Sequence, residues 1–580
     1  MSEWCRLYSR KKIWQNLNAK VADPYGAEIS KQKSDYNEAV LLENRLFPEI
    51  CELLNRYHHT NYDNRFWLII VGPWLKKILG LLINRIKTLK MCLDKFEISG
   101  TRAYESNISS LISSNYLSAM GCFRDDKWNN ILNYKIIKLL KDVKFSIDLI
   151  NDKNNHNSFI DFEFSDYKLK TSTNYKSYKL KILEWSFKVY CKIAKRLIRK
   201  KDAFIINSHL PLFEEIKLEL SLGQIPQLWG LQRRKLIWSL IKKKPDKILR
   251  DSLCKKLSNG SSDNLENIIR SLLFELLPVC YLEGFKDLDK IVNDQRWPKN
   301  PKFIFTSNSY DSDEIFKLWV AKQVNSGSKY YIGQHGCNYG VRWDNIHCIE
   351  EVTPDKFISW GWIDNSPKHL PAFIWKSSGQ KKLNYNSSGG LLLIETTIWN
   401  RFTTWDSSKP FFEYLNDQKK FVKNLSESSR QKLTIRLHPL SEYGIWDEEK
   451  RWLDFDPKLK IDKGKSKITK LISENRIVIH TYESTSMLET LSQNIPTLVF
   501  YKNGLDDLRK SALPYYKALI DEGIIHLSAE SAAKKVNEIW DDIDSWWFKS
   551  NIQKARKQFC DRYAKTSQNP ISEIKNILLS

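Results

Sequence analysis

The part of the chain after residue 300 alternates short apolar strands with amphipathic helices, and this alternation restricts the fold more than any other feature. The predicted units are strand 303–306, helix 313–324 and strand 330–333, followed by strand 476–479, helix 484–492 and strand 497–500. Compact strand–helix–strand units are right-handed and place their strands parallel. The sequence therefore predicts an α/β protein with parallel sheets.

A polar linker from Ser377 to Gly390 divides this alternating part into two halves. At 580 residues the chain is also too long for one compact core. We expect a first Rossmann-like domain at 201–385 and a second at 386–580. Residues 1–200 form an appended, largely helical N-terminal region, with a short strand predicted at Phe66–Val71. Two Rossmann-type halves joined by a linker resemble the GT-B arrangement.

The formal net charge is +24, but the basic residues are spread along the chain in short clusters. This pattern indicates a broadly positive surface and not a dedicated nucleic-acid reading element. No zinc-finger spacing or RNA-binding signature is present. We therefore predict no nucleic-acid partner.

The ten cysteines are scattered without a CxxC pair, which is typical of reduced thiols in a cytoplasmic protein. Residues 1–6 lack the apolar core of a secretion signal. The most apolar stretch, 66–83, is interrupted by Pro73, Lys76 and Lys77, which favours a buried segment over a membrane span. We expect a cytoplasmic protein whose positive surface contacts the anionic inner membrane peripherally.

The first candidate loop follows strand 330–333 and carries Gln334, His335 and Gly336, then Asn338 and Gly340. In parallel α/β sheets ligands bind at the carboxyl ends of strands. A neutral His there can take a proton from a hydroxyl, and flanking glycines let backbone N–H groups approach an anion. We predict His335 and Gln334 as catalytic, and the other three as donor-binding. A buried His bonded only to backbone is the alternative.

The second candidate loop follows strand 432–436 and carries Arg436, His438 and Pro439. Arg436 offers a fork for phosphate and His438 a single donor on the same strand face, while Pro439 ends the strand. Two surface basic residues at a strand end would look the same.

The third candidate loop precedes helix 484–492 and carries Ser484, Thr485 and Ser486, with Glu489 one turn into the helix. Hydroxyls and amides at a helix start form an anion site. We predict donor-phosphate binding by the hydroxyls and a ribose contact for Glu489. Ordinary N-capping and a solvent-facing Glu are the alternatives.

His335, Cys337, His347 and Cys348 lie close in sequence and are candidate metal ligands. Their spacings do not match common zinc ligand patterns. No Walker loop, nucleophile elbow or kinase signature is present. We predict neither a metal nor a cofactor.

Six blocks between about residues 60 and 500 resemble the transferase family encoded in O-antigen and surface-polysaccharide loci. The blocks are Phe66–Leu75, Leu282–Phe285, Gln334–Gly340, Asp355–Trp362, Arg436–Pro439 and Thr481–Ser486. One departure is Cys337, where the family pattern has a second Gly after His-Gly. More distantly, the His-Pro pair and the hydroxyl cluster are similar to motifs of GT-B sialyltransferases and Kdo transferases. The His-Gly combination is similar to that of CDP-glycerol glycerophosphotransferases.

The resemblance implies that His335 is the base or a donor-phosphate contact, and that His438 and residues 484–486 hold the donor phosphate. The acidic base motif of the sialyltransferases has no counterpart in the first half, since Asp521-Glu522-Gly523 lies after the donor motif.

The resemblance implies transfer of a sugar, such as an ulosonic acid, from a nucleotide-activated donor to a glycan or lipid-linked glycan acceptor in surface-polysaccharide synthesis. A CMP- or CDP-linked donor is favoured. Two alternatives stay open: a CDP-alditol glycerophosphotransferase-like polymerase, and a non-catalytic polysaccharide-assembly protein.

Overall fold

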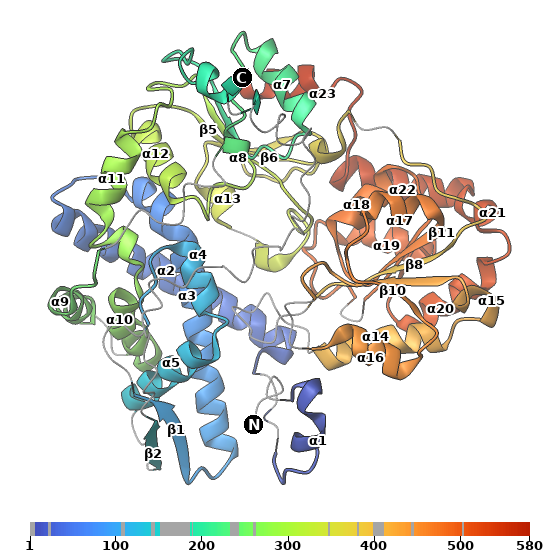
Figure 1. Ribbon diagram of the computed structural model, residues 1–580, viewed down its shortest axis with the longest axis horizontal. Helices are drawn as coiled ribbons and strands as arrows, with labels where there is room; N and C mark the ends of the chain where they lie inside the picture. The colour runs from blue at the N-terminus through green and yellow to red at the C-terminus, as the bar shows by residue number, and fades with distance from the viewer. Residues whose placement is uncertain are drawn as a thin grey trace.

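The computed structural model describes residues 6–580 except 21, 23–24, 106–110, 141–144, 151–185, 188, 233–242, 259–262, 346–347, 380–381, 398–410, 442–445 and 502–503. Two parallel sheets dominate the molecule (Figure 1). The predicted α/β class, with two Rossmann-type halves and a helical N-terminal region, is confirmed.

The first sheet has five parallel strands in chain order. They are β3 (Phe204–Ile206), β4 (Ile304–Thr306), β5 (Tyr330–Gly333), β6 (Lys356–Ser359) and β7 (His369–Pro371). The helices that lie between these strands in the chain are α7 (Leu212–Ser221), α8 (Trp229–Gln232), α9 (Lys247–Ser258), α10 (Asn264–Leu276), α11 (Phe285–Asn293), α12 (Glu314–Asn325) and α13 (Ile349–Val352). Of these, α9 and α10 pack against the N-terminal helices α2 (Ile29–His58) and α3 (Asn64–Lys95). Strand β5 is completely buried, so its carboxyl end delivers the His335 loop from a rigid base.

The second sheet has six parallel strands in the order β10-β9-β8-β11-β12-β13. They are β8 (Gly390–Ile394), β9 (Leu433–Arg436), β10 (Lys460–Asp462), β11 (Asn475–His480), β12 (Thr497–Phe500) and β13 (Ile525–His526). The winding direction reverses between β8 and β11. Open α/β sheets bind ligands at such a switch point, beyond the carboxyl ends of the strands.

Helices cover both faces of the second sheet (orange to red in Figure 1). They are α14 (Phe411–Lys423), α15 (Glu427–Arg430), α16 (Glu448–Phe455), α17 (Ile468–Glu474), α18 (Thr485–Ser492), α19 (Leu513–Asp521), α20 (Ala529–Ile539), α21 (Ile543–Trp547) and α22 (Ser550–Tyr563).

The last helix, α23 (Pro570–Leu579), leaves the second sheet and packs against α7 of the first half (Figure 1). The Lys575 ammonium donates to the carbonyl of Ser221 at 2.6 Å, and the backbone N–H of Lys565 donates to the carbonyl of Trp360 at 3.0 Å. The chain therefore connects the two halves twice. The predicted domain limits at residues 200 and 385 stay predictions.

The N-terminal region is built on two long helices, α2 (Ile29–His58) and α3 (Asn64–Lys95). Shorter elements are α1 (Lys11–Trp14), α4 (Tyr116–Cys122), α5 (Asp126–Leu139) and the parallel pair β1 (Gly100–Tyr104) and β2 (Ser146–Ile150). Helix α3 lies against α2 and α12, which attaches this region to the first half.

The predicted strand at Phe66–Val71 is wrong, because these residues lie inside α3. Asp63 caps the helix by accepting from the backbone N–H of Phe66 at 2.7 Å. The run is apolar on all sides because α3 is enclosed, so it lacks the stripe that marks a surface helix. Helix α3 is long and apolar enough to cross a membrane, but its most apolar 18-residue window is 83% buried within the protein.

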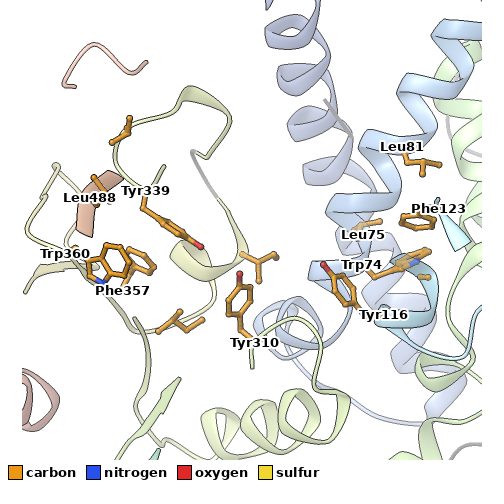
Figure 2. Close-up of a cluster of buried hydrophobic side chains, with 14 of the residues drawn as sticks. Trp74, Leu75, Leu81, Tyr116, Phe123, Tyr310, Tyr339, Phe357, Trp360 and Leu488 are labelled. Atoms are coloured by element: carbon orange, nitrogen blue, oxygen red, sulfur yellow. The ribbon is translucent and has the colours of Figure 1, made fainter. Parts of the chain in front are cut away.

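One continuous hydrophobic core joins the helical region to both halves. Figure 2 shows Trp74 and Leu75 of α3 beside Phe123, which directly follows α4, and shows Phe357 and Trp360 on the side of Leu488 of the second half. The candidate loops therefore rest on a common packed scaffold.

Candidate active site

Gln334 holds the loop that carries His335. Its side chain is 1% exposed, and the amide oxygen accepts from the backbone N–H of Trp360 and the indole N–H of Trp362, both at 2.9 Å. The amide nitrogen donates to the carbonyl of Gly336 at 2.8 Å. These three bonds direct the Gln334 amide at the loop and at two tryptophans, so the side chain positions the loop.

His335 is half-buried and meets the hydroxyl of Tyr339, whose oxygen lies 3.1 Å from Nδ1. The same hydroxyl donates to Oε1 of Glu350 at 2.6 Å. Burial and Glu350 raise the pKa of Tyr339 well above its ordinary value, so the phenol keeps its proton. A phenol has one proton to donate, and here Glu350 takes it. With this phenol proton directed at Glu350, Nδ1 of His335 is the donor to the Tyr339 oxygen, and the lone pair of the neutral imidazole is then on Nε2.

Tyr310 completes this arrangement by donating to the same Oε1 atom of Glu350 at 3.0 Å. Its pKa is likewise raised well above the ordinary value by burial and by Glu350. In Figure 2 the hydroxyl ends of Tyr310 and Tyr339 turn toward the same region. Glu350, on α13, thus accepts hydrogen bonds from two phenol hydroxyls.

Sequence reasoning missed this group. Tyr339 lies four residues after His335, inside a block that was noticed for its glycines. Glu350 lies fifteen residues after His335, beyond a turn. No periodic pattern in this segment indicates that Glu350 lies close to His335 in the folded chain. A tyrosine within the His-Gly loop was the one available signal.

His209 is a second imidazole at this end of the first sheet and was also missed. It follows β3 with a backbone φ of +62°, an uncommon conformation for a residue with a side chain. Its ring centroid lies 6.0 Å from that of His335. Burial, with His335 and Lys376 nearby, lowers the pKa of His209 to about 4, so this ring is uncharged at neutral pH.

Ser484 and Ser486 lie at the start of α18 in the second half. Ser484 is the N-cap: its Oγ accepts from the backbone N–H of Met487 at 3.0 Å and lies 3.0 Å from Oγ of Ser486. The neighbouring His480 Nδ1 is 3.3 Å from Oγ of Ser484, and burial lowers the pKa of His480 to about 3. Capping is confirmed for Ser484, and the anion-binding prediction stays open beside it.

Thr485 brings the first and third loops together. Its Oγ1 accepts from the backbone N–H of Cys337 at 3.2 Å, and Sγ of Cys337 lies 3.5 Å from the carbonyl oxygen of Glu483. A Cβ placed on Gly336 would be 3.3 Å from Oγ1 of Thr485, so a glycine permits this approach. The loop with His335 and the start of α18 therefore face each other across the two halves.

Glu489 also reaches across the two halves, since its Oε1 lies 3.0 Å from the ammonium of Lys376.

Asn338, in the His335 loop, has a φ of +78° and a buried Oδ1 without a hydrogen-bond partner. Gly340, with a φ of +70°, would place a Cβ 2.3 Å from the Trp362 ring, so close packing requires its small size.

Arg436 is buried, and one nitrogen of its guanidinium is paired. Its Nη1 donates to Oδ1 of Asp462 at 2.7 Å and to the carbonyl of Ser466 at 2.9 Å. Its Nη1 atom is thus engaged by Asp462 at the end of β10, a partner that the sequence does not announce, and phosphate binding by Arg436 stays a prediction. Pro439 packs against Gly464, and Nδ1 of His438 accepts from the backbone N–H of Leu440 at 3.2 Å.

Tyr482 connects the second and third loops. Burial raises the pKa of its hydroxyl to about 12, while Ser484, Thr396 and Arg436 act in the opposite direction. Burial and Arg436 also lower the pKa of His438, so this imidazole is a neutral donor or acceptor at neutral pH.

A second set of contacts fixes the two halves. Arg342 pairs with Asp344 at 2.8 Å in its own half and with Asp507 of the second half at 3.2 Å. Arg509 donates from Nε to the carbonyl of Arg342 at 2.9 Å. These contacts fix the position of the His335 loop relative to the second half.

Within the described part of the chain, no group of three or more His, Cys, Asp or Glu side chains is arranged to hold a metal. His347, weighed as a ligand, lies outside the described residues. The nine cysteines that are described are all free thiols.

Comparison with solved structures gives distant likenesses. The wall teichoic acid polymerase TagF, soaked with CDPG, is 14% identical, with a TM-score of 0.29 over 48% of this chain and 72% of that one. MurG of Acinetobacter baumannii is 10% identical, with a TM-score of 0.31 over 65% and 99%. The spinosyn rhamnosyltransferase SpnG is 11% identical, with a TM-score of 0.30 over 65% and 99%. No curated protein matches the chain. These values are too low to carry an argument, so the fold and the site rest on the geometry of the chain itself.

Proposed function

The chain belongs to the LIC12162 family of transferases, whose family model matches residues 1–578, and we propose that it moves a sugar from a nucleotide-activated donor to a glycan acceptor. In the proposed reaction, Nε2 of His335 takes the proton of an acceptor hydroxyl. The acceptor oxygen forms a bond to the anomeric carbon as the bond from that carbon to the donor phosphate breaks. The nucleotide leaves with the electron pair.

The observation that carries the proposal is the hydrogen-bonded series from His335 through Tyr339 to Glu350. It fixes the hydrogen on Nδ1 and leaves Nε2 as the acceptor that a general base requires. The carboxylate at the far end stabilises the imidazolium that forms during proton transfer. A His held only for structure needs no such series.

The start of α18 supports the donor side of the proposal. It follows β11 at the switch point of the second sheet, where parallel sheets bind nucleotides. The helix dipole, the backbone N–H groups of the first turn and the hydroxyls of Ser484 and Ser486 would stabilise the negative charge of the leaving phosphate. Neutral His480 beneath them adds no charge of its own.

The proposed setting is the synthesis of a bacterial surface polysaccharide, with a CMP- or CDP-linked donor and a glycan or lipid-linked glycan acceptor. The net charge of +24 supports a cytoplasmic location beside an anionic membrane surface.

Release of nucleotide from a CMP-linked ulosonic acid, in the presence of a glycan acceptor, tests the proposal. His335→Asn should lower kcat by about 10²- to 10⁴-fold, the usual contribution of a general base. The matched control is His59→Asn, because His59 caps α2 in a left-handed conformation that Asn tolerates. A kcat of His335→Asn equal to that of His59→Asn would show that His335 is not the general base.

Product mass separates the remaining alternatives. A CDP-glycerol donor that yields a phosphodiester product would establish the alditol-phosphate polymerase. Nucleotide binding without turnover, unchanged in His335→Asn, would establish a non-catalytic assembly role.

A further inference from the structure

A cavity of about 210 Å³ opens at the carboxyl ends of β11, β12 and β13, between α14 and α20. Its wall includes Thr481, Phe500, Tyr501 and Leu527. It is smaller than the roughly 300–1,000 Å³ of a site for a whole drug-sized ligand. Its size therefore suits one flat group of a larger ligand.

The cavity is tied to the switch point of the second sheet. Thr481 donates from Oγ1 to the carbonyl of Ile394, the last residue of β8, at 2.9 Å. Tyr414, another wall residue, lies 2.6 Å from the same Oγ1 atom and accepts from the backbone N–H of Thr396 at 2.9 Å. Thr481 is three residues before Ser484, the N-cap of α18. A ligand with its phosphate at α18 is thus positioned to extend into the cavity.

Gln418 supplies the observation that points to a ligand. This side chain lines the cavity from α14 and is 1% exposed, yet its amide oxygen has no hydrogen-bond partner. Buried polar groups in folded proteins are almost always paired, because leaving an acceptor unpaired costs its full desolvation free energy. A ligand that donates a hydrogen to this oxygen would satisfy it.

The rim of the cavity is also rich in acceptors. The carboxylates of Asp417 and Glu530 lie at 3.7 and 3.5 Å from the ammonium of Lys420, which they share. Tyr501 adds an aromatic ring, on which a base can stack. Acceptor oxygens around a flat slot favour a ring with an exocyclic amine.

We propose that this cavity binds the cytosine ring of the nucleotide donor, and that the amide oxygen of Gln418 accepts from its N4 amino group. Cytosine presents an N4 donor, whereas uracil presents an O4 acceptor at the same position. Uracil would therefore place its O4 against the Gln418 amide oxygen, and two acceptors cannot form a hydrogen bond. The inference rests on the proposed function and deepens it, since it assigns the nucleotide class and the residue that selects it.

Calorimetric titration of the full chain with CMP and UMP tests the assignment. The wild-type protein should prefer CMP. Gln418→Leu should weaken CMP binding about tenfold, the usual effect of one lost hydrogen bond, and should strengthen UMP binding, because it removes the oxygen that opposes uracil O4. Because it removes a buried unpaired oxygen, Gln418→Leu should keep or raise the melting temperature. The matched control is Gln431→Leu, because the Gln431 amide is exposed and bonds only to Glu427 in the described structure.

The outcomes are distinct. CMP affinity that is equal in Gln418→Leu and wild type overturns the base assignment and leaves the transferase proposal standing. A wild-type preference for UMP also overturns it. Failure of the wild-type protein to bind either nucleotide overturns both proposals. Gln418→Met, which keeps the length of the side chain, gives the same reading if the leucine variant does not fold.

Discussion

Removing the Tyr339 hydroxyl isolates the contribution of the series that joins His335 to Glu350. In Tyr339→Phe, Nδ1 of His335 loses its acceptor at 3.1 Å, while Glu350 keeps its bond from Tyr310 at 3.0 Å. The carboxylate therefore stays paired, and the change acts on the imidazole.

The size of the effect follows from the bond that is lost. A hydrogen bond to a charged or charge-developing group is worth about 1.5–3 kcal/mol, and about 1.4 kcal/mol is a factor of ten in rate. We expect kcat to fall about 10- to 100-fold, with KM nearly unchanged because Tyr339 is buried behind the imidazole. Glu350→Gln, which keeps an acceptor oxygen but removes the charge, should lie between this variant and wild type.

Steady-state nucleotide release measures kcat and KM. Nitrogen-15 NMR of labelled histidine reports which ring nitrogen carries the hydrogen, a property that a merely structural role would not change. We expect Nδ1–H in the wild type and a mixture of tautomers in Tyr339→Phe. Tyr57→Phe, on α2, is the control for loss of a phenol hydroxyl. Wild-type kcat in Tyr339→Phe, or hydrogen on Nε2 in the wild type, would refute the reasoning.

Two further predictions concern stability. Gly340→Ala should lower the free energy of unfolding by about 3 kcal/mol or more, because a left-handed backbone is combined with overlap against the Trp362 ring; an unchanged midpoint in urea would contradict this. Burial and Glu448 raise the pKa of Glu395 from about 4.5 to about 8. The folded state therefore binds a proton that the unfolded state has released between these pH values, so stability falls as pH rises from about 5 to 8. Glu395→Gln should remove this loss and be more stable than wild type by about 1–3 kcal/mol at pH 8.5, as measured by urea titration at pH 5 and 8.5; equal stability of the two proteins at both pH values would contradict it.

Strands β4, β5, β9, β11 and β12 were predictable because they are short, apolar and bounded by turns, whereas β7, β10 and β13 were not predicted. Strand β5 and the His335 loop, and β11 and the start of α18, lie where the sequence places them. Their mutual contact was expected only from the architecture, since Cys337 and Thr485 are far apart in the chain.

Other features depended on partners that a sequence does not reveal. Arg436 has the chemistry of a phosphate ligand, but the sequence gives no sign that β10 brings Asp462 within 2.7 Å of its Nη1 atom. Helix α3 looked like a strand at Phe66–Val71 because a fully enclosed helix loses its polar stripe. Glu350 lies close to His335 only because the segment between them folds back, and that segment has no helical or strand periodicity from which this could be predicted.

The return of α23 to the first half has a mechanical consequence. The chain crosses between the two halves at the 377–390 linker and again just before α23. Two crossings restrict relative motion of the halves mainly to rotation about the line that joins them. Opening that admits a bulky acceptor would then be a swing about that axis instead of a free separation. A variant shortened before Pro570 would lose the contact of α23 with α7, and its lobes should sample a wider range of angles.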